Sequence, residues 1–146
     1  MSFKFRLESL LTYRRFQLDQ CRQLMAEVMR DRANCEESME SLRGERELSL
    51  ETIRNENSSG QVNIRRMASL RYDVSQLDQN KRELMSHFQR YEHQLQLCRQ
   101  AVQQADAAVK ALERLKEKQQ KVDEAKQLKK SEIELQDAWA AVNLRS

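Results

Sequence analysis

The sequence predicts an all-α protein that forms a long two-helix antiparallel coiled-coil hairpin with an overhanging C-terminal helix. Three observations carry this prediction. The 146 residues include two glycines and no proline, so the chain has few places where it can turn. One cluster of turn-forming residues, Asn57-Ser58-Ser59-Gly60, interrupts the helical pattern. On both sides of it apolar residues recur every 3.5 residues, which is typical of coiled coils. We therefore expect a single coiled-coil domain over residues 1–146.

The first helix is predicted over about residues 4–56, followed by a turn at 57–61. Fourteen positions from Leu7 to Ile53, spaced alternately by four and three residues, test the heptad pattern, and ten of them are apolar. These ten are Leu7, Leu11, Leu18, Cys21, Met25, Val28, Cys35, Met39, Leu42 and Ile53. The exceptions are Arg14, Arg32, Arg46 and Ser49.

The second helix is predicted over about residues 62–141. Between Met67 and Leu112, 13 of 14 heptad positions are apolar and Lys81 is the exception. A repeat of 3.5 residues that continues over six or more heptads imposes a left-handed supercoil, whereas a helix on a globular core follows a 3.6-residue period. The pattern therefore predicts that each helix packs along most of its length on another long helix.

The two apolar seams fit a hairpin within one chain. If the chain reverses at Ser59-Gly60, the numbers of facing residues add up to about 119–120. Each polar exception then faces an apolar residue: Arg14 with Ala105, Arg32 with Phe88, Arg46 with Val74, Ser49 with Leu70, and Lys81 with Met39. Long side chains of this kind can lie along an apolar partner while their charge reaches water. A parallel homodimer would stack the seam arginines on themselves, so the hairpin is favoured.

The same register places further pairs opposite one another. Met25 is expected to face Leu95, and Cys35 to face Leu84. Cys21 and Cys98 are predicted to share a layer, as small apolar seam residues or, alternatively, as a regulatory disulfide. Labels on Met25 and Leu95 that lie far apart within a monomer would contradict the hairpin.

The second helix is predicted to lose its partner after about residue 115, where the first helix ends. Residues 110–130 hold eight basic and four acidic residues, and apolar residues return between Ile133 and Val142. A helix that is polar nearly all round is either solvated or inserted into a partner. The sequence leaves both readings open: a charged tail, or a shaft that enters a partner's cavity.

Nothing in the sequence predicts an enzyme, a cofactor or a metal site. Phosphate-binding glycine loops and catalytic motifs are absent, His87 and His93 lie six residues apart, and the three cysteines fit no zinc spacing. No apolar run is long enough for a transmembrane segment, and no secretory leader is recognisable. The net charge of +3 with interspersed signs predicts no nucleic-acid partner. We expect a cytoplasmic location.

Two terminal segments carry a family resemblance. The opening, Phe3-Lys4-Phe5-Arg6-Leu7-Glu8-Ser9-Leu10-Leu11 followed by Tyr13-Arg14-Arg15, resembles the start of FliJ-family flagellar export proteins. The stretch Leu112-Glu113-Arg114-Leu115-Lys116-Glu117-Lys118-Gln119, and the later Leu135-Gln136-Asp137-Ala138-Trp139-Ala140, are similar to that family's C-terminal segment. Trp139 departs from the pattern, because a Phe-like residue is expected there.

The resemblance implies a soluble component of flagellar type III protein export: a non-catalytic stalk that is inserted in the hexameric export ATPase and links it to the membrane export gate. Its partners would be the hexameric export ATPase, a membrane export gate protein and export chaperones, and its place would be peripheral, at the cytoplasmic face of the inner membrane. Residues expected to contact the ATPase ring are Arg114, Lys116, Lys118, Lys121, Lys126 and Trp139. Residues expected to contact the export gate are Tyr72 and His87, which lie off the seam.

Three other functions stay open at this point. One is the equivalent stalk of a virulence type III secretion system. Another is a passive coiled-coil spacer, which would bind no export ATPase. The third is a nucleic-acid binder that uses the basic residues between 110 and 130, whose affinity would fall steeply with salt.

Overall fold

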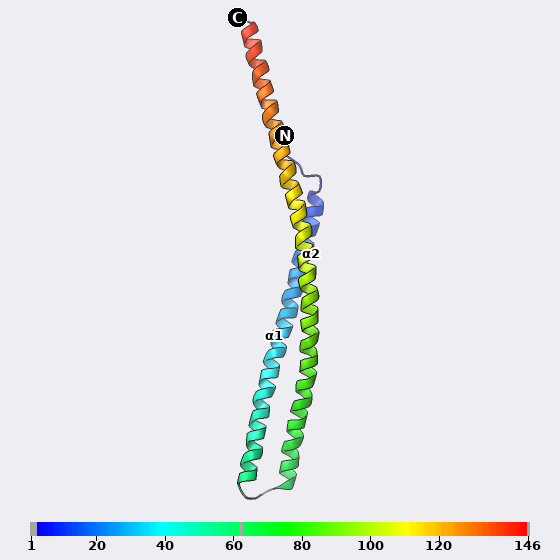
Figure 1. Cartoon of the computed structure of the whole chain (residues 1–146), viewed down its shortest axis with the longest axis vertical. Helices are drawn as coiled ribbons and strands as arrows, with labels where there is room; N and C mark the ends of the chain where they lie inside the picture. Colours follow the sequence, from blue (N-terminus) through cyan, green and yellow to red (C-terminus); the bar gives the residue numbers. More distant parts are fainter. Residues whose placement is uncertain (1–2, 62, 146) are drawn as a thin grey trace. The chain divides into compact units, whose positions relative to one another are not determined.

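The structure, a computed structural model, describes residues 3–61 and 63–145, which form two α-helices and no β-strand (Figure 1). Helix α1 spans Glu8–Ser58 and helix α2 spans Ile64–Leu144, with 51 and 81 residues. The predicted all-α helical hairpin is confirmed. Residues 1, 2, 62 and 146, which the sequence places in the same domain, lie outside the described residues.

Helix α1 begins four residues later than predicted, because the segment before it is not helical. The N–H of Glu8 donates a hydrogen bond to the carbonyl of Phe5 at 3.1 Å, which closes a turn ahead of the helix. This turn leaves Phe5 buried in the same cluster as Val109 of α2, with Phe3 packed beside it. The two aromatic side chains therefore anchor the entry to α1 rather than continuing it.

A short link joins the helices. Gly60 has a φ of 77°, a left-handed conformation that glycine adopts without the steric cost of a Cβ. The Asn63 side-chain oxygen accepts hydrogen bonds from the N–H groups of Arg65 and Arg66, at 3.1 and 3.3 Å, and so caps the first turn of α2. The turn predicted at 57–61 lies slightly too early, since α1 continues to Ser58 and α2 begins at Ile64.

The chain comprises two compact units, one of Met1–Cys21 with Ala101–Ser146 and one of Arg22–Gln100. In the Arg22–Gln100 unit the helices are antiparallel, because the partners on α2 fall in number as those on α1 rise. Arg32 forms an ion pair with Glu92 at 2.7 Å, and Arg46 forms one with Asp78 at 2.7 Å. The predicted facing of Arg32 and Phe88 is confirmed, since the guanidinium carbon lies 5.3 Å from the ring centre.

The same unit has its best-buried seam at the end away from the link. Val28, Leu95 and Cys98 form a buried cluster, against which Met25 and Tyr91 pack. Met25 therefore packs on the cluster that contains Leu95, in agreement with the predicted register. Closer to the link the seam is looser: among the described residues between 36 and 94, only Met67 is buried.

The unit formed by Met1–Cys21 and Ala101–Ser146 contains the larger buried cluster. Phe5, Leu11, Leu18 and Val109 are buried there. Phe3, Leu7, Val102, Ala105 and Leu112 pack around them. Two ion pairs link the helices at its edge, Arg15 with Glu113 at 3.2 Å and Glu8 with Lys116 at 2.9 Å.

Within this unit α2 continues beyond the residues that pack on it. Every described residue from 124 to 145 is exposed, and we call this segment the overhang. The predicted loss of the partner after about residue 115 is too early. Glu8 reaches Lys116, Phe3 reaches the turn of α2 that carries Val122, and Asp123 is still partly shielded.

Candidate partner-binding surfaces

The side chains in residues 3–61 and 63–145 include exposed apolar and basic groups suited to binding a partner. No group of three or more histidine, cysteine or acidic side chains in this part of the chain is placed to hold a metal ion. Over the same residues, neither helix contains a stretch apolar and long enough to cross a membrane. All three cysteines are free thiols, with Cys35 and Cys98 buried and Cys21 partly buried. The shared layer of Cys21 and Cys98 stays a prediction.

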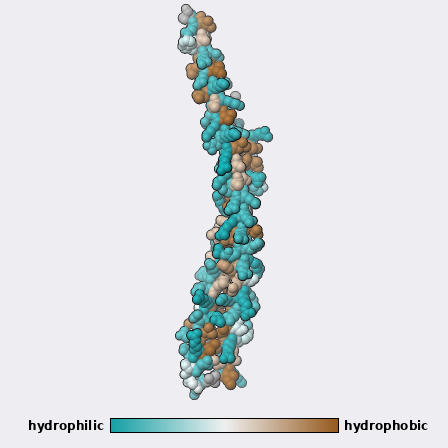
Figure 2. Space-filling model, viewed as in Figure 1, coloured by the Kyte–Doolittle hydropathy of each residue, from teal (hydrophilic) through white to brown (hydrophobic). Residues whose placement is uncertain are grey.

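The overhang carries large apolar side chains that no other part of its unit covers. Leu135, Trp139 and Val142 are each about 70% exposed, and Leu128 is 65% exposed. Figure 2 shows hydrophobic surface recurring along the C-terminal end of α2 between hydrophilic patches. Exposed apolar side chains that cluster in this way mark surfaces for binding.

The exposed apolar side chains of the overhang, together with Leu115 and Val122 just before it, follow helical spacing and form two stripes. The first stripe consists of Leu128, Leu135, Trp139 and Val142, and the second of Leu115, Val122, Ile133 and Leu144. At 3.6 residues per turn, the centres of the two stripes lie roughly 145° apart around the helix axis. The face that would continue the seam toward α1 is polar and includes Asp123, Lys130 and Glu134. The apolar residues of the overhang are thus not a continuation of the seam.

The basic residues predicted to contact an ATPase ring divide into two groups. Lys116 and Lys121 are already paired, with Glu8 at 2.9 Å and with Glu117 at 3.3 Å. Arg114, Lys118 and Lys126 form no ion pair within the described part of the chain, and all three are exposed. The structure therefore separates lysines that neutralise the protein's own carboxylates from lysines that are free for a partner.

A groove lies where the N-terminal segment meets α2. Phe3 forms one side of it, and Leu115, Lys118, Gln119, Val122, Asp123 and Lys126 form the other. Its volume is about 410 Å³. Sequence reasoning missed this groove, because it treated residue 4 as helical and so did not place Phe3 on α2.

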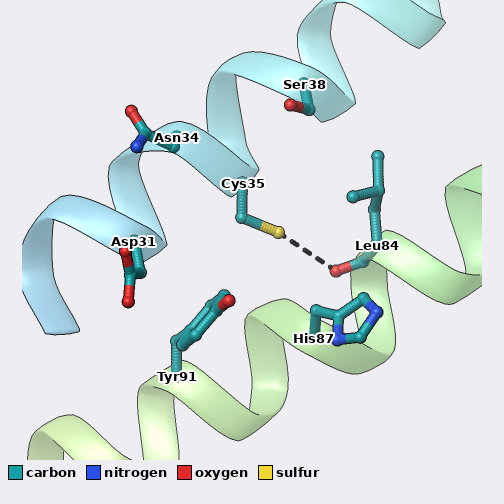
Figure 3. Close-up of a pocket in the computed structure, with 7 residues that line it drawn as sticks. All are labelled: Asp31, Asn34, Cys35, Ser38, Leu84, His87 and Tyr91. Carbon is teal, nitrogen blue, oxygen red and sulfur yellow. Dashed lines mark hydrogen bonds between the residues drawn. The ribbon is translucent and has the colours of Figure 1, made fainter.

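The residues predicted to contact an export gate lie on α2 in the Arg22–Gln100 unit. Tyr72 is 63% exposed, and His87 is exposed at the edge of a groove of about 250 Å³ (Figure 3). Across this groove the Cys35 thiol donates a hydrogen bond to the carbonyl of Leu84 at 3.2 Å, which confirms their predicted facing. Tyr72 and His87 lie 15 positions apart along α2.

Sequence reasoning found the basic stretch and Trp139 but missed the two-stripe arrangement. The signal was present: Leu128, Leu135, Trp139 and Val142 alternate by seven, four and three residues. It was hidden because only the continuation of the α1-facing seam was followed, and that face turns polar after Leu112.

The comparison with protein families agrees with the terminal motifs. The model of the family described as flagellar FliJ protein matches residues 3–145, nearly the whole chain. Neither the curated proteins nor the solved structures gave a match. The matched family consists of non-enzymatic components of flagellar protein export. With its helical hairpin and the match over nearly its full length, the chain belongs to the FliJ family of flagellar export proteins.

Proposed function

We propose that the protein is the stalk of the flagellar export ATPase, with the overhang inserted in the hexameric ring. The observation that carries this proposal is the pair of apolar stripes on α2 between Leu115 and Leu144, because all eight side chains of the stripes are exposed. A helix that docks on a flat surface needs one apolar face. Two such faces roughly 145° apart call for contact from several sides, as inside a ring.

Unpaired basic side chains near the overhang also support insertion of this end of α2 into the ring. Arg114, Lys118 and Lys126 remain without ion-pair partners among the described residues. Acidic loops lining a pore would complement them and would orient the helix and speed its association more than they would raise the affinity. Trp139 on the first stripe is the largest apolar side chain available for a central contact, and Trp is enriched among residues that dominate binding energy.

The hairpin end, roughly residues 40–90, is proposed to face the membrane export gate and to keep the protein peripheral at the inner membrane. Tyr72 and His87 are the candidate contacts, and both side chains are exposed. Export chaperones are the third proposed class of partner, in keeping with the family. The variant Y72A/H87A is expected to lose binding to the cytosolic domain of the gate protein while keeping its binding to the ATPase ring.

The insertion is tested with L128S/L135S/W139S, measured by sedimentation with the purified ATPase hexamer. Each side chain contributes about 1.5–3 kcal/mol when fully buried, so affinity is expected to fall by at least about tenfold. The matched control is L24S/M29S/L97S, because these three side chains are also about half exposed but lie outside the overhang. Equal binding by both variants and the wild type would leave a passive spacer as the better description.

A truncation variant provides a second test of the insertion. Removal of residues 128–146 keeps Phe3, Glu8 and all residues they contact on α2, so the paired helices are expected to stay folded. Binding to the ring should be lost, while the midpoint of urea unfolding should change little. Retained binding by a folded truncation variant would contradict insertion.

A further inference from the structure

The groove beside Phe3 combines an apolar floor with free positive charge. Phe3, Leu115 and Val122 supply the apolar surface, and Leu115 and Val122 are 36% and 50% exposed. Lys118 and Lys126 line the groove on either side of Val122 along α2. Val122 lies four residues from each lysine, so the three side chains occupy successive turns on one face of the helix.

The neighbouring lysines show which positive charges the chain already neutralises. Lys110, Lys116 and Lys121 each pair with a carboxylate of the chain, at 2.8, 2.9 and 3.3 Å. Lys118 and Lys126 have no ion pair within residues 3–61 and 63–145, although Asp123 lines the same groove. Lys129 and Lys130 also form no ion pair there but do not line the groove, so Lys118 and Lys126 are the unpaired lysines beside its apolar surface.

The occupant follows from this chemistry. A bilayer would need a longer apolar face than three side chains provide. Duplex nucleic acid offers phosphates but no apolar group to fill the space between Phe3 and Val122. A protein segment with an apolar side chain between acidic residues matches both features of the groove.

We propose that this groove binds an acidic segment of the export ATPase, whose central apolar side chain inserts between Phe3 and Val122 while its carboxylates pair with Lys118 and Lys126. The inference rests on the proposed stalk function and names the contact at the base of the overhang. It also divides the basic residues: Lys118 and Lys126 bind the partner, and Lys116 and Lys121 do not.

The test compares two charge reversals in the full-length chain, K118E/K126E and the matched K110E/K121E. Both change the charge by the same amount, and Lys110 and Lys121 lie on a face of α2 that is turned away from the groove residues. Affinity for the purified ATPase hexamer is expected to fall by at least about tenfold for K118E/K126E and by less than about threefold for K110E/K121E. The V122S variant should also weaken binding, with less change in its salt dependence.

The outcomes separate this inference from the proposed function. Equal losses of affinity in both charge reversals would mean nonspecific electrostatic attraction and would overturn the proposal that the groove binds the segment. Full binding by K118E/K126E and V122S, together with loss in L128S/L135S/W139S, would keep the stalk and overturn the groove alone. No binding by the wild type would overturn both. Tighter binding of wild type to a 20-base-pair DNA duplex than to the hexamer would also overturn the assigned occupant. Far-ultraviolet circular dichroism and urea unfolding show whether each variant is folded.

Discussion

Helix α2 uses its apolar residues in two different ways along its length. Where it pairs with α1, each unit buries apolar residues on one face of α2, with Leu95 buried in one unit and Val109 in the other. From Leu115 onward they form two stripes, and Leu128 and Trp139 stay exposed. The composition of the two regions is similar, so composition does not separate internal packing from binding. The angular spread of the apolar residues around the helix axis separates them.

The largest expected contrast comes from removing one leucine in each region. Leu11 is fully buried, so L11A should lower the free energy of unfolding by about 2–5 kcal/mol. Leu135 is 70% exposed, so L135A should change it by no more than about 0.5 kcal/mol. Urea unfolding followed by circular dichroism measures both. A comparable loss in L135A would mean that the overhang packs on its own chain.

A matched pair of glycine substitutions sharpens the contrast. Ala111 and Ala138 are both exposed, and each substitution costs about 1 kcal/mol of helix propensity. A111G should reduce global stability by that amount, because Ala111 lies in the paired region. A138G should instead speed local hydrogen exchange in the overhang without moving the global midpoint. Equal midpoints for both variants would show that pairing near Ala111 is not part of the cooperative unit.

The charged seam residue Arg32 tests how much the paired region depends on apolar layers. Its guanidinium stacks on Phe88 and pairs with Glu92, but its Nε is buried without a hydrogen-bond partner. Because Glu92 is 43% exposed, it stays solvated when Arg32 is removed. R32M should therefore keep the stability or raise it by about 1 kcal/mol. A clear loss in urea unfolding would assign net stabilisation to the ion pair.

The smallest expected contrast concerns two exposed ion pairs. Glu113 joins α2 to Arg15 of α1, whereas Glu117 pairs with Lys121 on the same helix. Both pairs are about half exposed or more, so E113Q should cost less than about 1 kcal/mol. E117Q should not affect global unfolding. The cost of E113Q should shrink as salt is raised, and a cost that is independent of salt would point to packing instead.

The sequence was sufficient to predict which residues of the two helices face each other. It was insufficient to predict where the helices begin and end. Arg32 opposite Phe88, Cys35 opposite Leu84 and Met25 with Leu95 all follow from the heptad positions, because regular spacing transmits the register along both helices. The start of α1 does not follow from periodicity. Phe5 fits the apolar pattern in either of two conformations. It could lie in the helix or, as observed, in a turn from which it packs on the core.

The candidate binding surfaces were predictable only in part. The basic residues of 110–130 were visible in the sequence, but their ion pairs depend on side-chain geometry. Lys116 forms an ion pair with Glu8, which is more than 100 positions away in sequence. The groove beside Phe3 needed the non-helical entry to α1, a detail that no spacing rule supplies. The proposed roles of Tyr72, His87 and Trp139 remain predictions for binding experiments.

The stacking of Arg32 on Phe88 restricts how this hairpin can change length during evolution. Removing one heptad from α1 between Arg32 and the link would keep the apolar stripes aligned, yet it would bring Arg32 opposite Lys81 in place of Phe88. Insertions and deletions are therefore tolerated best when α1 and α2 change in length together. The overhang has no facing arm, so its reach can vary by single helical turns without disturbing any layer.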